Sequence, residues 1–261
     1  MPPPITSLQN PKIKNLVKLR QRRQRDRQKL MLIDGVPALR LGLKNNFPID
    51  VLYFDQDKPN PELLQLAQAQ GVLAQPVSPE VFQKIGYGDN PDGHLGLAAQ
   101  PPFALENLPR PANPLYVIVE GLEKPGNLGA ILRSADAAGV AGLIVCEGQT
   151  DICNPNVIRA SRGAFFTVPI AYGRFAEVWP WLRQKQVHLL AASPEAQQAY
   201  TEVDMRAPTA LVLGAEHAGL THDWPGQTFI WIPMAGQVDS LNVAQAATIL
   251  LFEAVRQRTG R

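Results

Sequence analysis

The feature that most constrains the fold is an alternation, along residues 115–256, of short apolar runs with longer amphipathic stretches. The apolar runs lie at 115–119, 143–146, 167–170, 188–192, 210–213 and 229–232. Helical patterns lie between several of them, at 128–138, 175–184 and 241–256. Continuous apolar strands that alternate with helices are typical of a parallel sheet covered on both faces. The sequence therefore predicts an α/β fold here, with ligands bound beyond the carboxyl ends of the strands.

The first hundred residues predict a second, smaller α/β domain. The expected elements are a basic helix through Lys29, a strand at 30–33, a helix to about 44, a strand at 49–54, a helix at 61–70, a short helix capped by Ser78 and a strand at 95–99. Five prolines between 101 and 114 then remove backbone donors and fix φ, which predicts a stiff linker. The expected division is 1–100, a linker at 101–113, and 114–261.

The distribution of charge points to a polyanionic partner. Residues 1–30 contain nine lysines and arginines against one aspartate, whereas the whole chain has a net charge of only +2. A basic arm on an acidic body favours nucleic acid, and the alternative is a solvated helix with no partner. A second basic stretch, at 154–164, leaves the same two possibilities open for Arg159 and Arg162. The candidate RNA-binding residues are Lys12, Lys14, Lys18, Arg20, Arg22, Arg23 and Arg162.

Other residue patterns exclude several classes of protein. Cys146 and Cys153 give neither a disulfide framework nor a zinc spacing, which indicates free thiols in a reducing compartment. The four histidines form no metal-ligand motif, so no metal is expected. The chain opens on a polar, basic stretch rather than an apolar one, and its longest apolar segment is interrupted by polar residues. A cytoplasmic protein is expected.

Two loops that follow predicted strands carry polar residues and glycines. In residues 120–133, EGLEKPGNLGAILR, a helix is expected to begin at or just after Asn127, a favourable N-cap residue, and Arg133 lies off its apolar face. In residues 213–220, LGAEHAGL, two glycines flank Glu216 and expose backbone groups that can hydrogen-bond a nucleoside. Either loop taken alone is equally consistent with an ordinary helix start or glycine turn.

A third loop, IPMAGQVDSLN at 232–242, leads into the long C-terminal helix. Ser240 is predicted to cap that helix, whose positive end could face a phosphate or carboxylate.

In this order on one α/β unit, the three loops resemble the signature motifs of the SpoU branch of the SPOUT methyltransferases, also called the TrmH family. The resemblance covers essentially all of residues 114–261, and IPMAG with SLNVAQA is its most diagnostic part. The N-terminal part, with ITSLQNPKIKNLVKLRQRR and LMLIDG, resembles the L30e-like substrate-binding domain of the ribosomal RNA members.

The resemblance implies a deep trefoil knot, a homodimer, and S-adenosylmethionine-dependent methylation of a ribose 2′-hydroxyl in RNA. It places the cofactor against Gly214, Ile232, Met234 and Leu241. The catalytic set that it implies is Asn127, Arg133, Glu216, Ser240 and Asn242, all present in this chain. Because arginine stays protonated in proteins, the preferred role for Arg133 is to hold an RNA phosphate and stabilise the developing alkoxide.

Three departures from the family pattern leave this set intact. Glu120 stands where many members have aspartate, Gly126 precedes Asn127 where a bulkier residue is common, and Ser134 replaces a frequent threonine.

The preferred function is methylation of ribosomal RNA. The alternatives are methylation of transfer RNA, whose enzymes commonly lack the L30e-like domain, and a non-catalytic RNA-binding or ribosome-assembly factor. A dinucleotide enzyme is disfavoured, because no predicted strand is followed by G-x-G-x-x-G.

Overall fold

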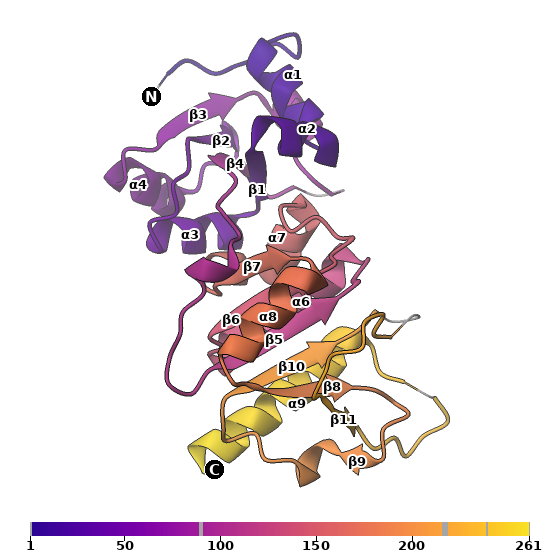
Figure 1. Ribbon diagram of the computed structural model, residues 1–261. Helices are drawn as coiled ribbons and strands as arrows, with labels where there is room; N and C mark the ends of the chain where they lie inside the picture. Colours follow the sequence, from indigo (N-terminus) through magenta and orange to yellow (C-terminus); the bar gives the residue numbers. More distant parts are fainter. Residues whose placement is uncertain (1, 89–90, 216–218, 239, 261) are drawn as a thin grey trace. The chain divides into compact units, whose positions relative to one another are not determined.

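The computed structural model describes every residue except 1, 89–90, 216–218, 239 and 261 (Figure 1). The chain divides into two compact units, neither of which is one continuous stretch of sequence. The first unit holds the residues up to Pro101 together with Asp151–Thr167. The second holds Pro102–Thr150 and the chain from Val168 onward.

The first unit is a four-stranded mixed sheet with helices around it. The strands follow the order β1-β4-β2-β3, with β4 antiparallel to β1 and β2, and β2 parallel to β3. The elements are α1 (Pro11–Lys18), α2 (Arg22–Gln28), β1 (Leu30–Asp34), α3 (Val36–Lys44), β2 (Val51–Asp55), α4 (Pro61–Ala69), β3 (Leu73–Val77), α5 (Pro79–Ile85), β4 (His94–Ala99), α7 (Pro155–Ser161) and the 3₁₀ turn η2 (Ala164–Phe166). Ser78 accepts a hydrogen bond from Val81 N and caps α5, as predicted.

The prediction of one basic helix through Lys29 is wrong, because α1 and α2 are separated by a turn. Arg25, buried at 2% exposure, explains the break. Its Nη1 donates to the carbonyl oxygens of Leu19 and Arg20 at 2.7 and 2.8 Å, and its Nε donates to Asp151 Oδ2 at 3.0 Å. Arg25 therefore satisfies carbonyl groups at the end of α1 that a continuous helix would have paired internally.

The second unit is a seven-stranded sheet in the order β7-β6-β5-β10-β8-β11-β9. All of its strand pairs are parallel, which confirms the predicted α/β fold class. The elements are η1 (Leu105–Asn107), β5 (Leu115–Glu120), α6 (Pro125–Ala138), β6 (Gly142–Cys146), β7 (Ile170–Gly173), α8 (Phe175–Gln184), β8 (His188–Ala192), β9 (Gln198–Ala199), η3 (Tyr200–Glu202), β10 (Thr209–Leu213), β11 (Thr228–Trp231) and α9 (Val243–Thr259). The deep trefoil knot stays a prediction.

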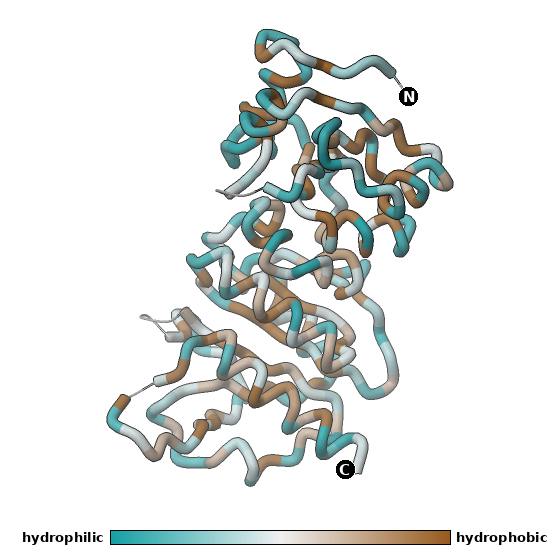
Figure 2. The backbone as a smooth tube through the Cα atoms, turned by 180° about the vertical axis from the view of Figure 1, so that it is seen from behind, coloured by the Kyte–Doolittle hydropathy of each residue, from teal (hydrophilic) through white to brown (hydrophobic). Residues whose placement is uncertain are grey.

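Helices cover the parallel sheet through apolar side chains that alternate along the strands. Tyr116 and Ile118 of β5 pack with Trp181 and Leu182 of α8 in one buried cluster. Because side chains alternate between the faces of a strand, Glu120 projects on this same face. Helices α6 and α9 pack on each other, and Ser134 Oγ lies 2.7 Å from Thr248 Oγ1. Figure 2 shows how strongly hydrophobic the central strands of this unit are.

The proline-rich segment, from Pro102 onward, is part of the second unit. Leu105 and Leu108 are buried in its core, and the Phe103 carbonyl accepts a hydrogen bond from Tyr172 N at 2.8 Å. None of the described helices combines the length and apolar character that a membrane crossing requires.

Three local predictions need correction. Helix α6 begins at Pro125 with Lys124 as its N-cap, so Asn127 lies inside the first turn, because proline is favoured at the first helical position. Helix α9 is capped by Asn242, not Ser240, and Asn242 Oδ1 accepts from Ala244 N at 2.9 Å. The strand predicted at 167–170 begins only at Ile170, because residues 164–166 form the turn η2.

Candidate active site

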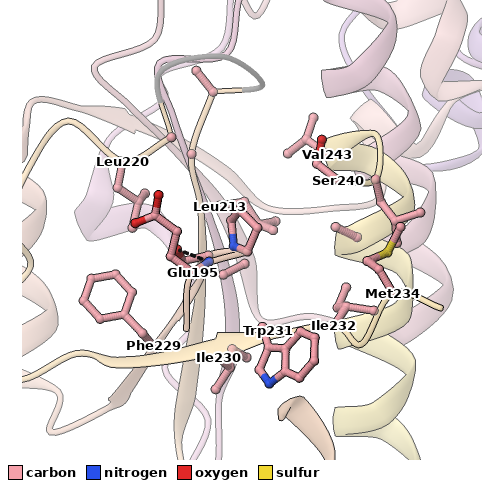
Figure 3. A pocket seen from close by; sticks show the side chains of 18 of the residues that line it. Glu195, Leu213, Leu220, Phe229, Ile230, Trp231, Ile232, Met234, Ser240 and Val243 are labelled. Atoms are coloured by element: carbon pink, nitrogen blue, oxygen red, sulfur yellow. Dashed lines mark hydrogen bonds between the residues drawn. The ribbon is translucent and has the colours of Figure 1, made fainter. Parts of the chain in front are cut away.

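A cavity of about 790 Å³ opens beyond the carboxyl ends of β8, β10 and β11. It has the position expected of a ligand site in a parallel α/β sheet. In Figure 3, Ile232, Met234, Ser240 and Val243 lie on one side of the cavity, and Leu220 and Glu195 lie on the other. All four residues predicted to bind the cofactor contribute to its wall: Gly214, Ile232, Met234 and Leu241.

Gly214 allows a close backbone approach at the base of the second motif. Ala215 and Gly219 exchange two backbone hydrogen bonds of 2.9 Å, which hold these two residues side by side. A Cβ atom on Gly214 would lie 2.2 Å from the carbonyl carbon of Gly219 and 2.5 Å from Leu220 N. Only glycine fits this position without displacing backbone atoms.

The cavity has a polar side that sequence reasoning missed in part. Ser193 and Glu195, which follow β8, line it together with Thr221, His222 and Asp223. The carboxyl end of the 188–192 strand could have signalled the β8 loop, because ligand-binding loops gather at that edge of the sheet. The strand order β10-β8-β11, which brings this loop to the cavity, is not visible in the sequence.

The structure brings three of the five predicted catalytic residues close to the cavity. Asn242 Nδ2 donates to Asn127 Oδ1 at 3.2 Å, which joins the first turn of α6 to the cap of α9. Ser240, two residues before Asn242, lines the cavity directly. Arg133 is exposed further along α6, and Glu216 lies outside the described residues.

Glu120, at the end of β5, is fully buried and accepts hydrogen bonds from one short segment, Thr221 to Trp224. Its Oε1 accepts from Thr221 N at 2.8 Å, His222 N at 3.0 Å and His222 Nδ1 at 2.9 Å, and also from the Thr221 hydroxyl. Its Oε2 accepts from Trp224 Nε1 at 2.8 Å. Burial raises the pKa of Glu120, but the hydrogen bonds from Thr221, Trp224 and His222 outweigh it and hold the pKa below its usual range.

The candidate RNA-binding residues fall into two groups. Lys12, Lys14, Lys18, Arg23 and Arg162 are exposed on the first unit. Arg20 is also exposed but donates to the Gly86 carbonyl and lies 5.0 Å from the centre of the Tyr87 ring, and Arg22 pairs with Asp26 at 3.5 Å.

For Arg159 the sequence allows either an RNA contact or a solvated charge. Its Nη1 lies 3.1 Å from Asp34 Oδ2 and 2.7 Å from the Tyr87 carbonyl oxygen, so it joins α7 to β1 within the first unit.

Comparisons with known proteins agree with this architecture. Residues 114–252 match the SpoU rRNA Methylase family. The chain belongs to this family. Residues 10–96 match the MRM3-like substrate binding domain.

Two curated relatives of this SpoU methylase span nearly its whole length. One is an uncharacterized tRNA/rRNA methyltransferase from Synechocystis, 35% identical over 97% of this chain and 94% of the relative. The other is a 23S rRNA (guanosine-2′-O-)-methyltransferase from Ralstonia nicotianae, 36% identical over 88% of this chain and 97% of the relative.

A solved structure of an rRNA methyltransferase from Sinorhizobium meliloti with bound AdoMet is 32% identical. The two chains match with a TM-score of 0.87 over 97% of each. The predictions of family, of an S-adenosylmethionine-dependent RNA 2′-O-methyltransferase and of its cofactor are thereby confirmed.

The cavity of this methylase fits a nucleoside cofactor. Its apolar wall at Ile232, Met234 and Leu241 suits an adenine ring, and the glycine at 214 lets backbone groups approach the ligand. The polar wall from Thr221 to Asp223 offers hydrogen-bonding groups to the hydroxyl, amine and carboxylate groups of such a cofactor.

Proposed function

We propose that this methylase modifies a ribose 2′-hydroxyl of ribosomal RNA, with the cavity at β8, β10 and β11 as its S-adenosylmethionine site. The observation that carries the assignment is the Asn127–Asn242 contact, which joins the first and third motifs next to the cavity wall. When bound, the cofactor supplies an electrophilic methyl group.

The residues of the chain then have to position the ribose and assist the loss of its hydroxyl proton. Asn127, Ser240 and Asn242 orient the ribose and the arginine. Arg133 holds an RNA phosphate and stabilises the negative charge that develops on the ribose oxygen. Glu216 keeps its predicted role in fixing the second-motif loop or the cofactor amine.

Ribosomal RNA is the preferred substrate because the first unit matches a substrate-binding domain and carries the basic helices α1 and α2. The Ralstonia relative, which shares most of this chain's length, is named for the same kind of substrate. Transfer RNA is the alternative substrate that the assays must separate from ribosomal RNA. We further propose a homodimer that works in the cytoplasm without a metal.

The proposed function is tested by methyl transfer from labelled S-adenosylmethionine to unmodified ribosomal and transfer RNA. The modified position is mapped by its resistance to alkaline cleavage. One resistant ribose in ribosomal RNA is the expected result. Labelling of transfer RNA alone would replace the proposed substrate. Cofactor binding without labelling of either naked RNA or ribosomal precursor particles would overturn the proposed substrate.

Substitution of Lys12, Lys14 and Lys18 by alanine is expected to weaken RNA binding and to flatten its salt dependence. These lysines are exposed on α1, where they can neutralise phosphates and release counterions. Loss of three contacts lowers the slope of log K against log salt by about 2 to 3. Affinity is measured by filter binding at several salt concentrations.

The matched control replaces three exposed lysines outside the arm, Lys44, Lys58 and Lys84. An equal loss of slope in the control would show that α1 has no special part in RNA binding.

A further inference from the structure

Part of the polar wall of the cavity is formed by Thr221, His222 and Asp223, in a segment that is neither helix nor strand. A loop segment of this kind has no regular pattern of helix or sheet hydrogen bonds to define its conformation. Its backbone donors and side chains must be held by other parts of the fold if the wall is to be formed before the cofactor arrives.

Glu120 supplies that support from outside the cavity. The carboxylate is fully buried and collects both backbone N–H groups and both polar side chains of Thr221 and His222 on one oxygen. Its second oxygen accepts from Trp224 Nε1, and Trp224 is itself fully buried. Neither Glu120 nor Trp224 is among the residues that line the cavity.

Ring packing adds a second support to the same segment. The His222 ring stacks on Phe175 with centroids 4.4 Å apart and an interplanar angle of 13°. Phe175 also meets Trp224 edge to face at 4.9 Å. Because a carboxylate can only accept, His222 Nδ1 donates in this contact.

We propose that Glu120 is a positioning residue, which preforms the Thr221–Asp223 wall for the polar groups of S-adenosylmethionine without touching the cofactor. The inference rests on the proposed assignment of the cavity to this cofactor. The two oxygens of the Glu120 side chain between them reach donors from Thr221 to Trp224.

The test measures the affinity of the full-length, cofactor-free protein for S-adenosylmethionine by isothermal titration calorimetry. Glu120→Gln keeps the size of the side chain but replaces one acceptor oxygen by an N–H₂ donor. At least one donor of the Thr221–Trp224 segment then faces no acceptor, and we expect affinity about 10- to 100-fold weaker. Glu120→Asp, which keeps both carboxylate oxygens, is expected to bind the cofactor with an affinity between those of the wild type and Glu120→Gln.

The matched control is Glu253→Gln. Glu253 is a carboxylate of the same unit with only 8% exposure, and it accepts from Arg256 and Gln257 on α9 outside the cavity lining. We expect this variant to lower the melting temperature as Glu120→Gln does, with cofactor affinity unchanged. Equal loss of affinity in both variants would reduce Glu120 to a general stabilising residue and overturn the proposal.

A measurement on the wild type keeps the inference testable if Glu120→Gln does not fold. The amide hydrogens of Thr221 and His222 should exchange slowly in the cofactor-free protein, because Glu120 already holds them. Exchange as fast as in exposed loops would overturn the proposal. Trp224→Phe, which removes the donor to Oε2 outside the cavity lining, should weaken cofactor binding in the same direction.

Leu241→Trp distinguishes a failure of this inference from a failure of the cavity assignment on which it rests. The bulky side chain at position 241 would occupy the cavity itself. If Leu241→Trp binds the cofactor normally, the cavity assignment fails. If Leu241→Trp loses binding and Glu120→Gln does not, only the role of Glu120 is refuted.

Discussion

Replacing Gly214 by alanine is expected to weaken S-adenosylmethionine binding about 5- to 150-fold, the effect of roughly 1–3 kcal/mol of overpacking. The added methyl would lie 2.2 and 2.3 Å from the carbonyl carbon and oxygen of Gly219, and neither atom can rotate away as a side chain could. The Ala215–Gly219 hydrogen bonds must then lengthen, which displaces these two residues in the cavity wall. Calorimetric titration with the cofactor measures the loss, and circular dichroism checks the fold.

Gly126→Ala is the matched control. Gly126 is exposed on α6 outside the cavity lining, and a Cβ atom there meets nothing within 4 Å, so cofactor affinity should stay near that of the wild type. If Gly214→Ala bound the cofactor as tightly as Gly126→Ala, the close approach at the second motif would be irrelevant to binding.

Arg133→Ala is expected to lower the rate of methyl transfer by about 100- to 1,000-fold, the range typical for loss of one group that stabilises a developing anion. Cofactor affinity should not change, because Arg133 is exposed on α6 and is not among the residues that line the cavity. Single-turnover methylation of the substrate RNA separates the chemical step from binding.

Two further variants sharpen the prediction for Arg133. Arg133→Lys should recover only part of the rate, because lysine keeps the charge and loses the planar, bidentate geometry of the guanidinium. Arg183→Ala removes an exposed arginine from α8 of the same unit and should leave the rate unchanged. Full activity of Arg133→Ala would remove this residue from the catalytic set.

The parallel sheet could be predicted from continuous apolar strands, a local pattern. The convergence of the second and third motifs on one cofactor pocket was implied by the resemblance to the SpoU branch, because the patterns alone placed ligands only beyond the carboxyl ends of the strands. Helix starts were less predictable. Asn127 and Ser240 are both good cap residues, yet Pro125 and Asn242 determine where α6 and α9 begin.

Contacts between residues far apart in the chain could not be predicted. Glu120 and Thr221 are separated by 101 positions, and no local pattern couples them. Arg25 looks like any other charge of the basic arm, although it is buried against Leu19, Arg20 and Asp151. Apolar periodicity identifies which side chains are buried, but it does not identify the partners of a buried charge.

Residues 151–167 belong to the first unit although they follow the start of the second unit in the sequence, and this limits how the two units can be exchanged between relatives. Helix α7 is encoded inside the methylase region, yet it packs with β1 and α3 as part of the first unit. A chimera that exchanged only residues up to Pro101 with a relative would therefore pair a foreign β1 with the native α7. To transfer the first unit intact, a chimera must take both the residues up to Pro101 and residues 151–167 from the same relative. The two units therefore cannot be exchanged at a single junction in the sequence.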